Sequence, residues 1–108
     1  MNANEYQRLA LRTLNPGLSR ADMLLNSVMG LCGESGEACD LVKKMRFQGH
    51  ALDVDRFKKE LGDVAWYLAE AAAAVDSSLE EILQMNLDKL RARYPDGFDP
   101  EKSIHREP

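Results

Sequence analysis

Two matched pairs of carboxylates stand in the sequence, Glu34 with Glu37 and Glu60 with Asp63. The members of each pair are three residues apart, so both lie on one face of the chain if the segment is helical. If the two helices run antiparallel, the four acidic groups converge. Crowded carboxylates repel one another unless cations lie between them. The pattern therefore predicts a divalent-metal site.

The type of metal follows from the type of ligand. Carboxylates without histidine or thiolate suit a hard ion, which predicts Mg²⁺, with Mn²⁺ as the alternative. A ferritin-like di-iron site needs Glu-x-x-His pairs, whereas these pairs end in Glu37 and Asp63. Each acid alone would be an ordinary solvated helix carboxylate. Four of them at matched spacing favour the metal site.

Glycines accompany both acid pairs, at Gly33, Gly36 and Gly62. A glycine inside a helix costs on the order of 1 kcal/mol relative to alanine. A close approach of another backbone, or of a ligand beside the carboxylates, would offset that cost. Tight helix packing and a nearby ligand are both open explanations.

The elements that must position these acids are helices. Apolar residues recur at helical spacing and no run alternates with period two, which predicts an all-α chain. The expected helices run over about residues 4–14, from the N-cap Ser19 to near Phe47, from Asp53 or Asp55 to about Val75, and from Ser78 to about Arg93. We expect one domain over residues 1–108, arranged like a four-helix bundle, with a polar tail without periodicity from about residue 95.

Local signals fix the ends of these helices. Gly49 is a C-terminal stop, and the short connection after it predicts an antiparallel pair of long helices. Ser78 and Glu81 have the spacing of a reciprocal capping box. Cys32 and Cys39 would lie about 10 Å apart on one helix, too far for a disulfide. We expect both thiols to be reduced and to pack in the helix interface.

Both long helices carry an apolar stripe that we expect to face the core. The stripes comprise Leu24, Val28, Leu31, Ser35, Ala38, Val42 and Met45, and then Val54, Phe57, Leu61, Val64, Leu68 and Val75. Each acid lies close beside a stripe residue. The acids should therefore border the buried interface.

A second polar group lies on the last long helix, where Asn86, Lys89 and Arg93 follow one row. An amide and two cations on one face could hold phosphate. The alternative is a solvated helix end, where the helix dipole favours cations. Near four metal-binding acids, we interpret these residues as substrate ligands.

Further substrate contacts are predicted beside each acid pair. Lys43 and Lys44 follow the first pair by about two turns; spacing does not choose between them, and Lys44 is our candidate for a phosphate contact. Trp66 and Tyr67 follow the second pair, and either could stack on a base. Trp66 is our candidate, with core packing as the alternative.

Composition excludes several classes of protein. The chain has 108 residues and a formal net charge of −4, which argues against a stable nucleic-acid partner. No stretch approaches the roughly 20 apolar residues of a membrane span. The first residues lack a basic, apolar signal peptide, which favours the cytoplasm.

Three segments together resemble a known family. They are GLCGESGE at residues 30–37, KELGDVAWYL at 59–68 and NLDKLRARYPDGF at 86–98. Their order and separation are similar to those of the MazG-type nucleotide pyrophosphohydrolases of the small single-domain kind. The resemblance extends over nearly the whole chain.

This resemblance implies an enzyme that hydrolyses the α–β phosphate bond of nucleoside triphosphates, releasing a monophosphate and pyrophosphate. It implies that Glu34, Glu37, Glu60 and Asp63 bind Mg²⁺, and that a glutamate, Glu34 or Glu37, deprotonates the attacking water. It places Asn86 and Lys89 on the nucleotide, and it implies a homodimer or homotetramer. The competing interpretation is a non-catalytic helical oligomer that binds Mg²⁺-nucleotide as a sensor or structural module.

Overall fold

Every regular element in the part of the chain that the computed structural model describes, residues 1–106, is helical. In chain order they are α1 (Ala3–Ala10), the 3₁₀ turn η1 (Leu11–Thr13), α2 (Arg20–Phe47), α3 (Val54–Ala74), α4 (Leu79–Arg93) and α5 (Pro100–Ile104). The predicted all-α class is confirmed, and the four expected helices are present. No helix within residues 1–106 is both long and apolar enough to cross a membrane.

Side-chain caps begin the two long helices where the sequence places them. The Ser19 hydroxyl accepts the Asp22 N–H at 3.1 Å, and the Asp53 carboxylate accepts the Arg56 N–H at 3.1 Å. Each cap satisfies a backbone donor that has no partner inside the helix. Asp53, rather than Asp55, is therefore the cap of α3.

The start of α4 keeps half of the predicted capping box. The Ser78 hydroxyl accepts the Glu81 N–H at 3.1 Å, as expected. The Glu81 carboxylate does not complete the box, because it accepts the Ser77 hydroxyl proton at 2.8 Å instead. A neighbouring hydroxyl has replaced the backbone donor.

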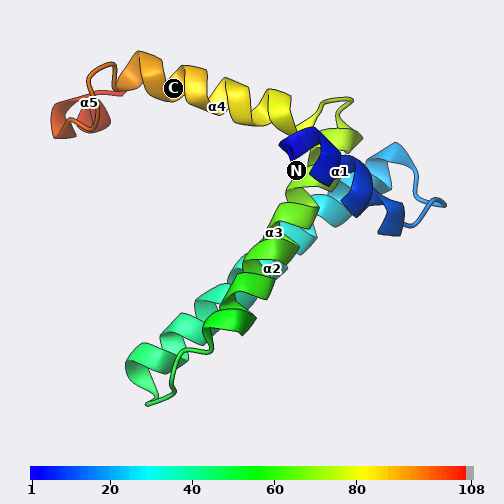
Figure 1. The fold of residues 1–108 in the computed structure, drawn as a ribbon, viewed down its shortest axis with the longest axis horizontal. Helices are drawn as coiled ribbons and strands as arrows, with labels where there is room; N and C mark the ends of the chain where they lie inside the picture. Colours follow the sequence, from blue (N-terminus) through cyan, green and yellow to red (C-terminus); the bar gives the residue numbers. More distant parts are fainter. Residues whose placement is uncertain (107–108) are drawn as a thin grey trace.

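The two long helices α2 and α3 form an antiparallel hairpin (Figure 1). After Phe47 the chain turns through Gly49, whose φ of +72° lies in the left-handed region that glycine adopts without strain. The predicted stop at Gly49 and the antiparallel pairing are confirmed. This hairpin positions all four acids.

The N-terminal segment ties the hairpin to α4. The Gln7 amide donates to the Ala69 carbonyl at 3.1 Å, and its oxygen accepts the Leu79 N–H at 3.0 Å. The Trp66 indole N–H donates to the Ala10 carbonyl at 3.0 Å. One glutamine and one tryptophan therefore hold α1, α3 and the start of α4 together.

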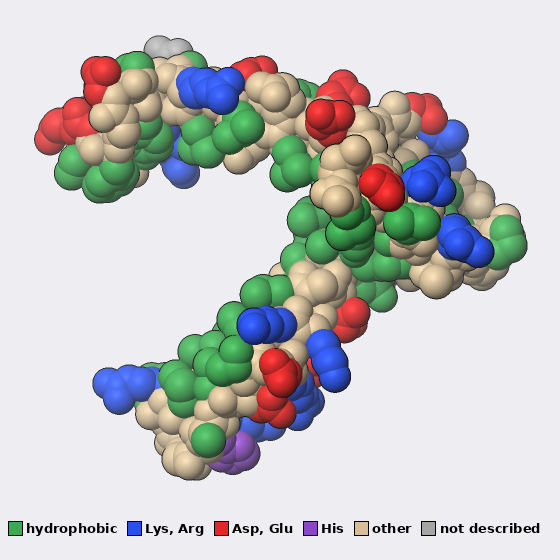
Figure 2. Space-filling model, viewed as in Figure 1, with side chains coloured by type: hydrophobic (Ala, Val, Ile, Leu, Met, Phe, Trp, Pro, Cys, Tyr) green, Lys and Arg blue, Asp and Glu red, His purple; other side chains and the backbone are tan. Residues whose placement is uncertain are grey.

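Beyond this junction α4 leaves the hairpin instead of packing along it, so the chain forms two arms (Figure 1). The radius of gyration is 16.8 Å, against about 13 Å for a compact chain of this length. Hydrophobic side chains line both arms where they face the hollow between them (Figure 2). A single copy therefore does not close a compact four-helix bundle.

The apolar stripes of the hairpin are only partly covered, contrary to expectation. Leu24, Val28, Val42 and Leu61 are all more than a third exposed. Among the described residues, the buried apolar side chains are Ala38, Ala69, Ala72, Ala74 and Leu79. Two helices cannot enclose a stripe that both present to the same side, and no third helix covers it here.

The cysteines and the C-terminal segment also depart from expectation. Cys32 and Cys39 are free, as predicted, but both are exposed rather than packed. The segment after residue 95 contains α5, because the Asp99 carboxylate caps it through the Glu101 N–H at 3.0 Å and Pro100 occupies its first turn. The last two residues of the predicted tail lie outside the described part.

Candidate metal centre

The antiparallel helices α2 and α3 contact each other along their length, and we call this interface the α2–α3 seam. At one level of this interface the Asn26 amide donates to both carboxylate oxygens of Glu70, at 2.9 and 3.0 Å. Glu70 is completely buried, and so is the adjacent Ser27. About one turn further along α2, the Tyr67 ring lies against Gly30, where a Cβ would come within 2.1 Å of the ring. One turn further along α2, acidic side chains face each other across the interface.

Three of the four predicted metal ligands lie close together at this level of the α2–α3 seam. Glu34 from α2 and Glu60 and Asp63 from α3 each place one carboxylate oxygen within 4.8 Å of the others. Glu34 and Glu60 are half-buried and Asp63 is exposed. We call these three residues the acidic cluster. Glu37 lies one turn along α2, exposed and outside it.

The charges of the cluster act on one another. A hydrogen bond shared with Glu60, together with partial burial and the negative charges of Asp63, Glu60 and Glu37, raises the pKa of Glu34. Glu37 is therefore close enough to contribute repulsion, although it does not join the cluster. In the absence of a cation, the cluster relieves repulsion by favouring a proton on Glu34.

The cluster fits a divalent cation by its donors and spacing. All three groups supply carboxylate oxygens, the donors that Mg²⁺ and Mn²⁺ prefer. Oxygens bound to one octahedral Mg²⁺ lie about 3.0 Å apart when adjacent and about 4.2 Å apart when opposite, so the three carboxylates, whose oxygens lie within 4.8 Å of one another, would close around a bound ion. A cation here would also remove the repulsion that now raises the Glu34 pKa.

One neighbour of the cluster comes from a helix that sequence reasoning did not connect with it. Partial burial and the negative charge of Asp63 raise the pKa of the Tyr6 phenol, which places this α1 side chain beside the cluster. The sequence predicts only that residues 4–14 form a helix, and it does not place Tyr6 near the acids. Its contact depends on the way Gln7 docks α1 across α3, which no local pattern reveals.

The glycines beside the acids have a different explanation from the close approach at Gly30. A Cβ at Gly33, Gly36 or Gly62 would meet nothing within 4 Å. Helix packing within the described chain therefore does not account for them. The space beside these glycines is open in one copy.

The predicted phosphate contact Lys44 has a partner within its own helix. Its ammonium lies 2.7 Å from the Asp40 carboxylate, and Lys43 lies 3.5 Å from the same group. These cations hold the pKa of Asp40 below its ordinary value. Lys44 stays a prediction as a substrate ligand, and a phosphate would have to compete with Asp40 for it.

The predicted stacking residue Trp66 takes part in the fold. Its indole N–H donates to the Ala10 carbonyl and to the Thr13 hydroxyl, both at 3.0 Å. Its ring lies edge-on to the Tyr67 ring, with centroids 5.0 Å apart. These contacts occupy the polar edge of the indole. A role in stacking on a base stays a prediction, and it would have to use the exposed part of the ring.

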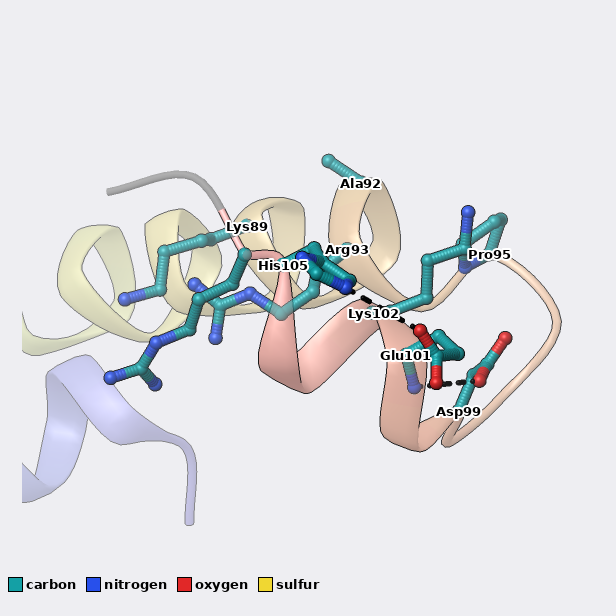
Figure 3. Close-up of a pocket in the computed structure, with 9 residues that line it drawn as sticks. Lys89, Ala92, Arg93, Pro95, Asp99, Glu101, Lys102 and His105 are labelled. Atoms are coloured by element: carbon teal, nitrogen blue, oxygen red, sulfur yellow. Dashed lines mark hydrogen bonds and ion pairs between the residues drawn. The ribbon is translucent and has the colours of Figure 1, made fainter.

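The three predicted ligands on α4 lie apart from the acidic cluster. Asn86 is exposed on the arm that points away from the hairpin (Figure 1). Lys89 and Arg93 line a cavity between α4 and α5 (Figure 3). Within one copy, the structure does not bring these side chains to the carboxylates. Their role as substrate ligands stays a prediction.

An all-helical domain with a carboxylate cluster between two antiparallel helices is the class that this fold and site define. The sequence model described as the MazG nucleotide pyrophosphohydrolase domain matches residues 24–98, which include the whole acidic cluster. The chain belongs to this family. It is also similar to the Gene 37 protein of Mycobacterium phage L5, with 37% identity over 105 residues, covering 90% of this chain and 92% of the phage protein. No solved structure matches the chain.

Proposed function

We propose that this chain is a Mg²⁺-dependent nucleoside triphosphate pyrophosphohydrolase that cleaves the α–β phosphate bond, giving a nucleoside monophosphate and pyrophosphate. The observation that carries the proposal is the convergence of Glu34, Glu60 and Asp63 within a domain of the MazG family. Mn²⁺ is the alternative ion. The role would be removal of non-canonical or surplus (deoxy)nucleotides.

The residues of the cluster would divide the work. Glu34, Glu60 and Asp63 would hold the ion, and Glu37 would join them through a side-chain rotation, since its charge already acts on Glu34. When bound, the ion neutralises charge on phosphate oxygens and acidifies water. Glu34 or Glu37 would accept the proton of the attacking water. The pKa of Glu34 is raised by the hydrogen bond with Glu60, by partial burial and by the neighbouring acids, so this carboxylate takes up a proton more readily than an ordinary glutamate does.

The substrate ligands on α4 would act on the site of a neighbouring copy. Lys89 and Arg93 carry charges that suit a triphosphate, yet their arm points away from their own hairpin. A homodimer or homotetramer would place the α4 arm of one copy over the hairpin of the next. The exposed leucines of α4, such as Leu83 and Leu87, support an assembly of this kind.

The test is pyrophosphate release from a panel of canonical and modified (deoxy)nucleoside triphosphates, with Mg²⁺ and with chelator. We expect metal-dependent release of pyrophosphate and an equal amount of monophosphate. Release of inorganic phosphate and diphosphate instead would refute the proposed bond. Nucleotide binding by calorimetry without turnover across the panel would favour the non-catalytic module.

A further inference from the structure

A carboxyl group that the proposed reaction does not use lies in the α2–α3 seam. Glu70 of α3 is completely buried. Both of its carboxylate oxygens accept from the Asn26 amide of α2, at 2.9 and 3.0 Å. Within residues 1–106, no cation forms an ion pair with Glu70. The fold has thus taken a carboxyl group out of water and given it one neutral side-chain partner.

Such a pair adds little to the stability of two packed helices. Removing a carboxyl group from water costs free energy, and apolar side chains of similar size would stabilise the seam at least as well. A buried polar pair instead selects one arrangement, because it is satisfied only where donor and acceptor meet. In this seam the arrangement is the register of α2 against α3.

The register that this pair fixes is also the register of the acidic cluster. Glu34 lies two helical turns beyond Asn26 along α2, and Asp63 lies two turns from Glu70 along α3. The polar pair and the acids are therefore about 11 Å apart along the seam. A slip of one helix along the other that separates the polar pair also separates Glu34 from Asp63.

The remaining contacts of the seam do not exclude a slip of about one turn. The apolar stripes repeat every three or four residues, so after such a slip apolar side chains again lie opposite apolar side chains. The Tyr67 ring rests in the notch at Gly30. After a slip it would meet Gly33, a second glycine one turn along α2.

The buried carboxyl group does exclude this slip. One turn to either side of Asn26, α2 has no side-chain N–H or O–H to donate, because the candidates there are an ionised aspartate, methionine and glycine. These residues are Asp22, Met23, Met29 and Gly30. A slipped register would leave Glu70 buried without a side-chain partner, which is strongly unfavourable.

We propose that Asn26 and Glu70 are positioning residues of the metal centre: their hydrogen-bonded pair fixes the register of α2 against α3, and this register brings Glu34 to Glu60 and Asp63. The inference rests on the proposed function, in which the acidic cluster holds Mg²⁺. Neither positioning residue belongs to the cluster itself.

The first test exchanges donor and acceptor without changing the size of either side chain. Asn26→Asp places a second carboxylate against Glu70. We expect the affinity of the full chain for Mn²⁺, measured by electron paramagnetic resonance, to fall about tenfold or more, as it does when outer-shell partners of a metal site are lost. Adding Glu70→Gln restores an amide–carboxylate pair and should restore the affinity. A double variant as weak as Asn26→Asp would overturn the proposal.

The second test separates register from stability. In Asn26→Leu with Glu70→Leu, we expect a melting temperature equal to or above the wild type, but about tenfold or more weaker Mn²⁺ binding. The matched control, Gln84→Ala with Asp88→Ala, removes an amide–carboxylate hydrogen bond of 2.8 Å within α4 and should keep the affinity. Wild-type affinity in the leucine variant would overturn the proposal. The exchange variants decide if the leucine variant does not fold.

The register itself is measured without metal. Spin labels are attached to Cys32 and to Arg56→Cys, exposed positions on α2 and α3, in a chain with Cys39→Ser that is diluted with unlabelled chain in EDTA. The distance between the labels should shift by up to about 5 Å, one helical turn, in the leucine variant and in Asn26→Asp, and return in the exchange variant.

This distance distinguishes failure of the inference from failure of the proposed function. An unchanged distance in the leucine variant and in Asn26→Asp would overturn the positioning role, whatever their Mn²⁺ affinity. A wild type that binds no Mn²⁺ would instead refute the metal centre, and the label distances would still decide whether the pair fixes the register.

Discussion

The α2–α3 hairpin and the α4 arm differ in how much of their structure one copy completes. Along the α2–α3 seam, Asn26 satisfies the buried Glu70 carboxylate, and the Tyr67 ring fits the notch at Gly30. Along α4, by contrast, Leu83 and Leu87 remain 47% and 44% exposed beyond a buried first residue. The contacts between α2 and α3 are complete in one copy, although both helices leave an apolar stripe exposed, whereas most of α4 has no partner helix at all.

This contrast separates two tasks. The hairpin presents the acidic cluster with a geometry that needs only its own two helices. The arm carries the basic residues that a polyphosphate would need, but it holds them away from the cluster. Metal binding is therefore expected of each single copy, whereas turnover is expected to depend on how copies meet.

The largest expected effect comes from removing the acids of the α2–α3 hairpin. Glu34→Gln or Asp63→Asn removes a metal ligand while keeping the side chain's shape. We expect turnover of nucleoside triphosphate to fall at least about 100-fold, because the loss of outer-shell partners alone costs 10- to 100-fold. Circular dichroism should stay near normal, since neither side chain is fully buried. Unchanged activity in either variant would disprove the metal centre.

A second test changes the exposed leucines of α4. Leu83→Asp with Leu87→Asp should convert an assembly to single chains, because each leucine buried at an interface contributes about 1.5–3 kcal/mol. Sedimentation velocity measures the mass. The control is Met85→Asp, two residues from each leucine and so on the opposite side of α4, at 64% exposed. If the leucine variant keeps the wild-type mass, α4 is not the contact between copies.

Sequence and structure agree where local chemistry decides. The four expected helices, the Ser19 cap, the choice of Asp53 or Asp55 as the cap of α3 and the stop at Gly49 depend on neighbours in sequence and were predicted, whereas α5 was not. The spacing of Glu34, Glu60 and Asp63 predicted their meeting, because an antiparallel hairpin fixes it.

Features set by long-range packing were not predictable. An apolar stripe indicates that a helix packs against another element, but not whether that element belongs to the same copy. The stripes were therefore assigned to a core that one copy does not build. The approach of Tyr6 to Asp63 and the notch at Gly30 depend on docking angles and helix register, which residue spacing does not encode.

A third, smaller effect sharpens the division of tasks. Lys89→Ala removes a cation from the arm and leaves the acidic cluster intact. We expect KM for nucleoside triphosphate to rise about tenfold, since a hydrogen bond to a charged group contributes about 1.5–3 kcal/mol. Affinity for Mn²⁺ alone, measured by electron paramagnetic resonance, should not change. A loss of Mn²⁺ affinity would show that the arm supports the metal centre directly.

The glycines allow a matched comparison within one helix. At Gly30 an alanine Cβ would lie 2.1 Å from the Tyr67 ring, so Gly30→Ala should cost about 1–3 kcal/mol of unfolding free energy. At Gly33 a Cβ meets nothing within 4 Å, so Gly33→Ala should gain up to about 1 kcal/mol. Denaturant titration measures both. A destabilising Gly33→Ala would mean that something outside this chain fills the open space.

The smallest expected effect is a pH dependence at the acidic cluster. The pKa of Glu34 is raised in the folded chain by the shared hydrogen bond with Glu60 and by repulsion from neighbouring acids. The folded state therefore holds this proton to higher pH than the unfolded state does. The associated stability is present below the ordinary glutamate pKa, and it is lost as pH rises through the raised value.

Glu34→Gln keeps a hydrogen-bond donor at every pH and removes the charge. In EDTA, the melting temperature of this variant should match the wild type in acid and exceed it near neutral pH. Saturating Mg²⁺ should reverse the order, because only the wild type retains the full ligand set. Asp96→Asn, in the exposed turn after α4, removes the same charge and should show no such reversal. A wild type that stays as stable as Glu34→Gln in EDTA at neutral pH would mean that repulsion in the cluster is already relieved without a cation.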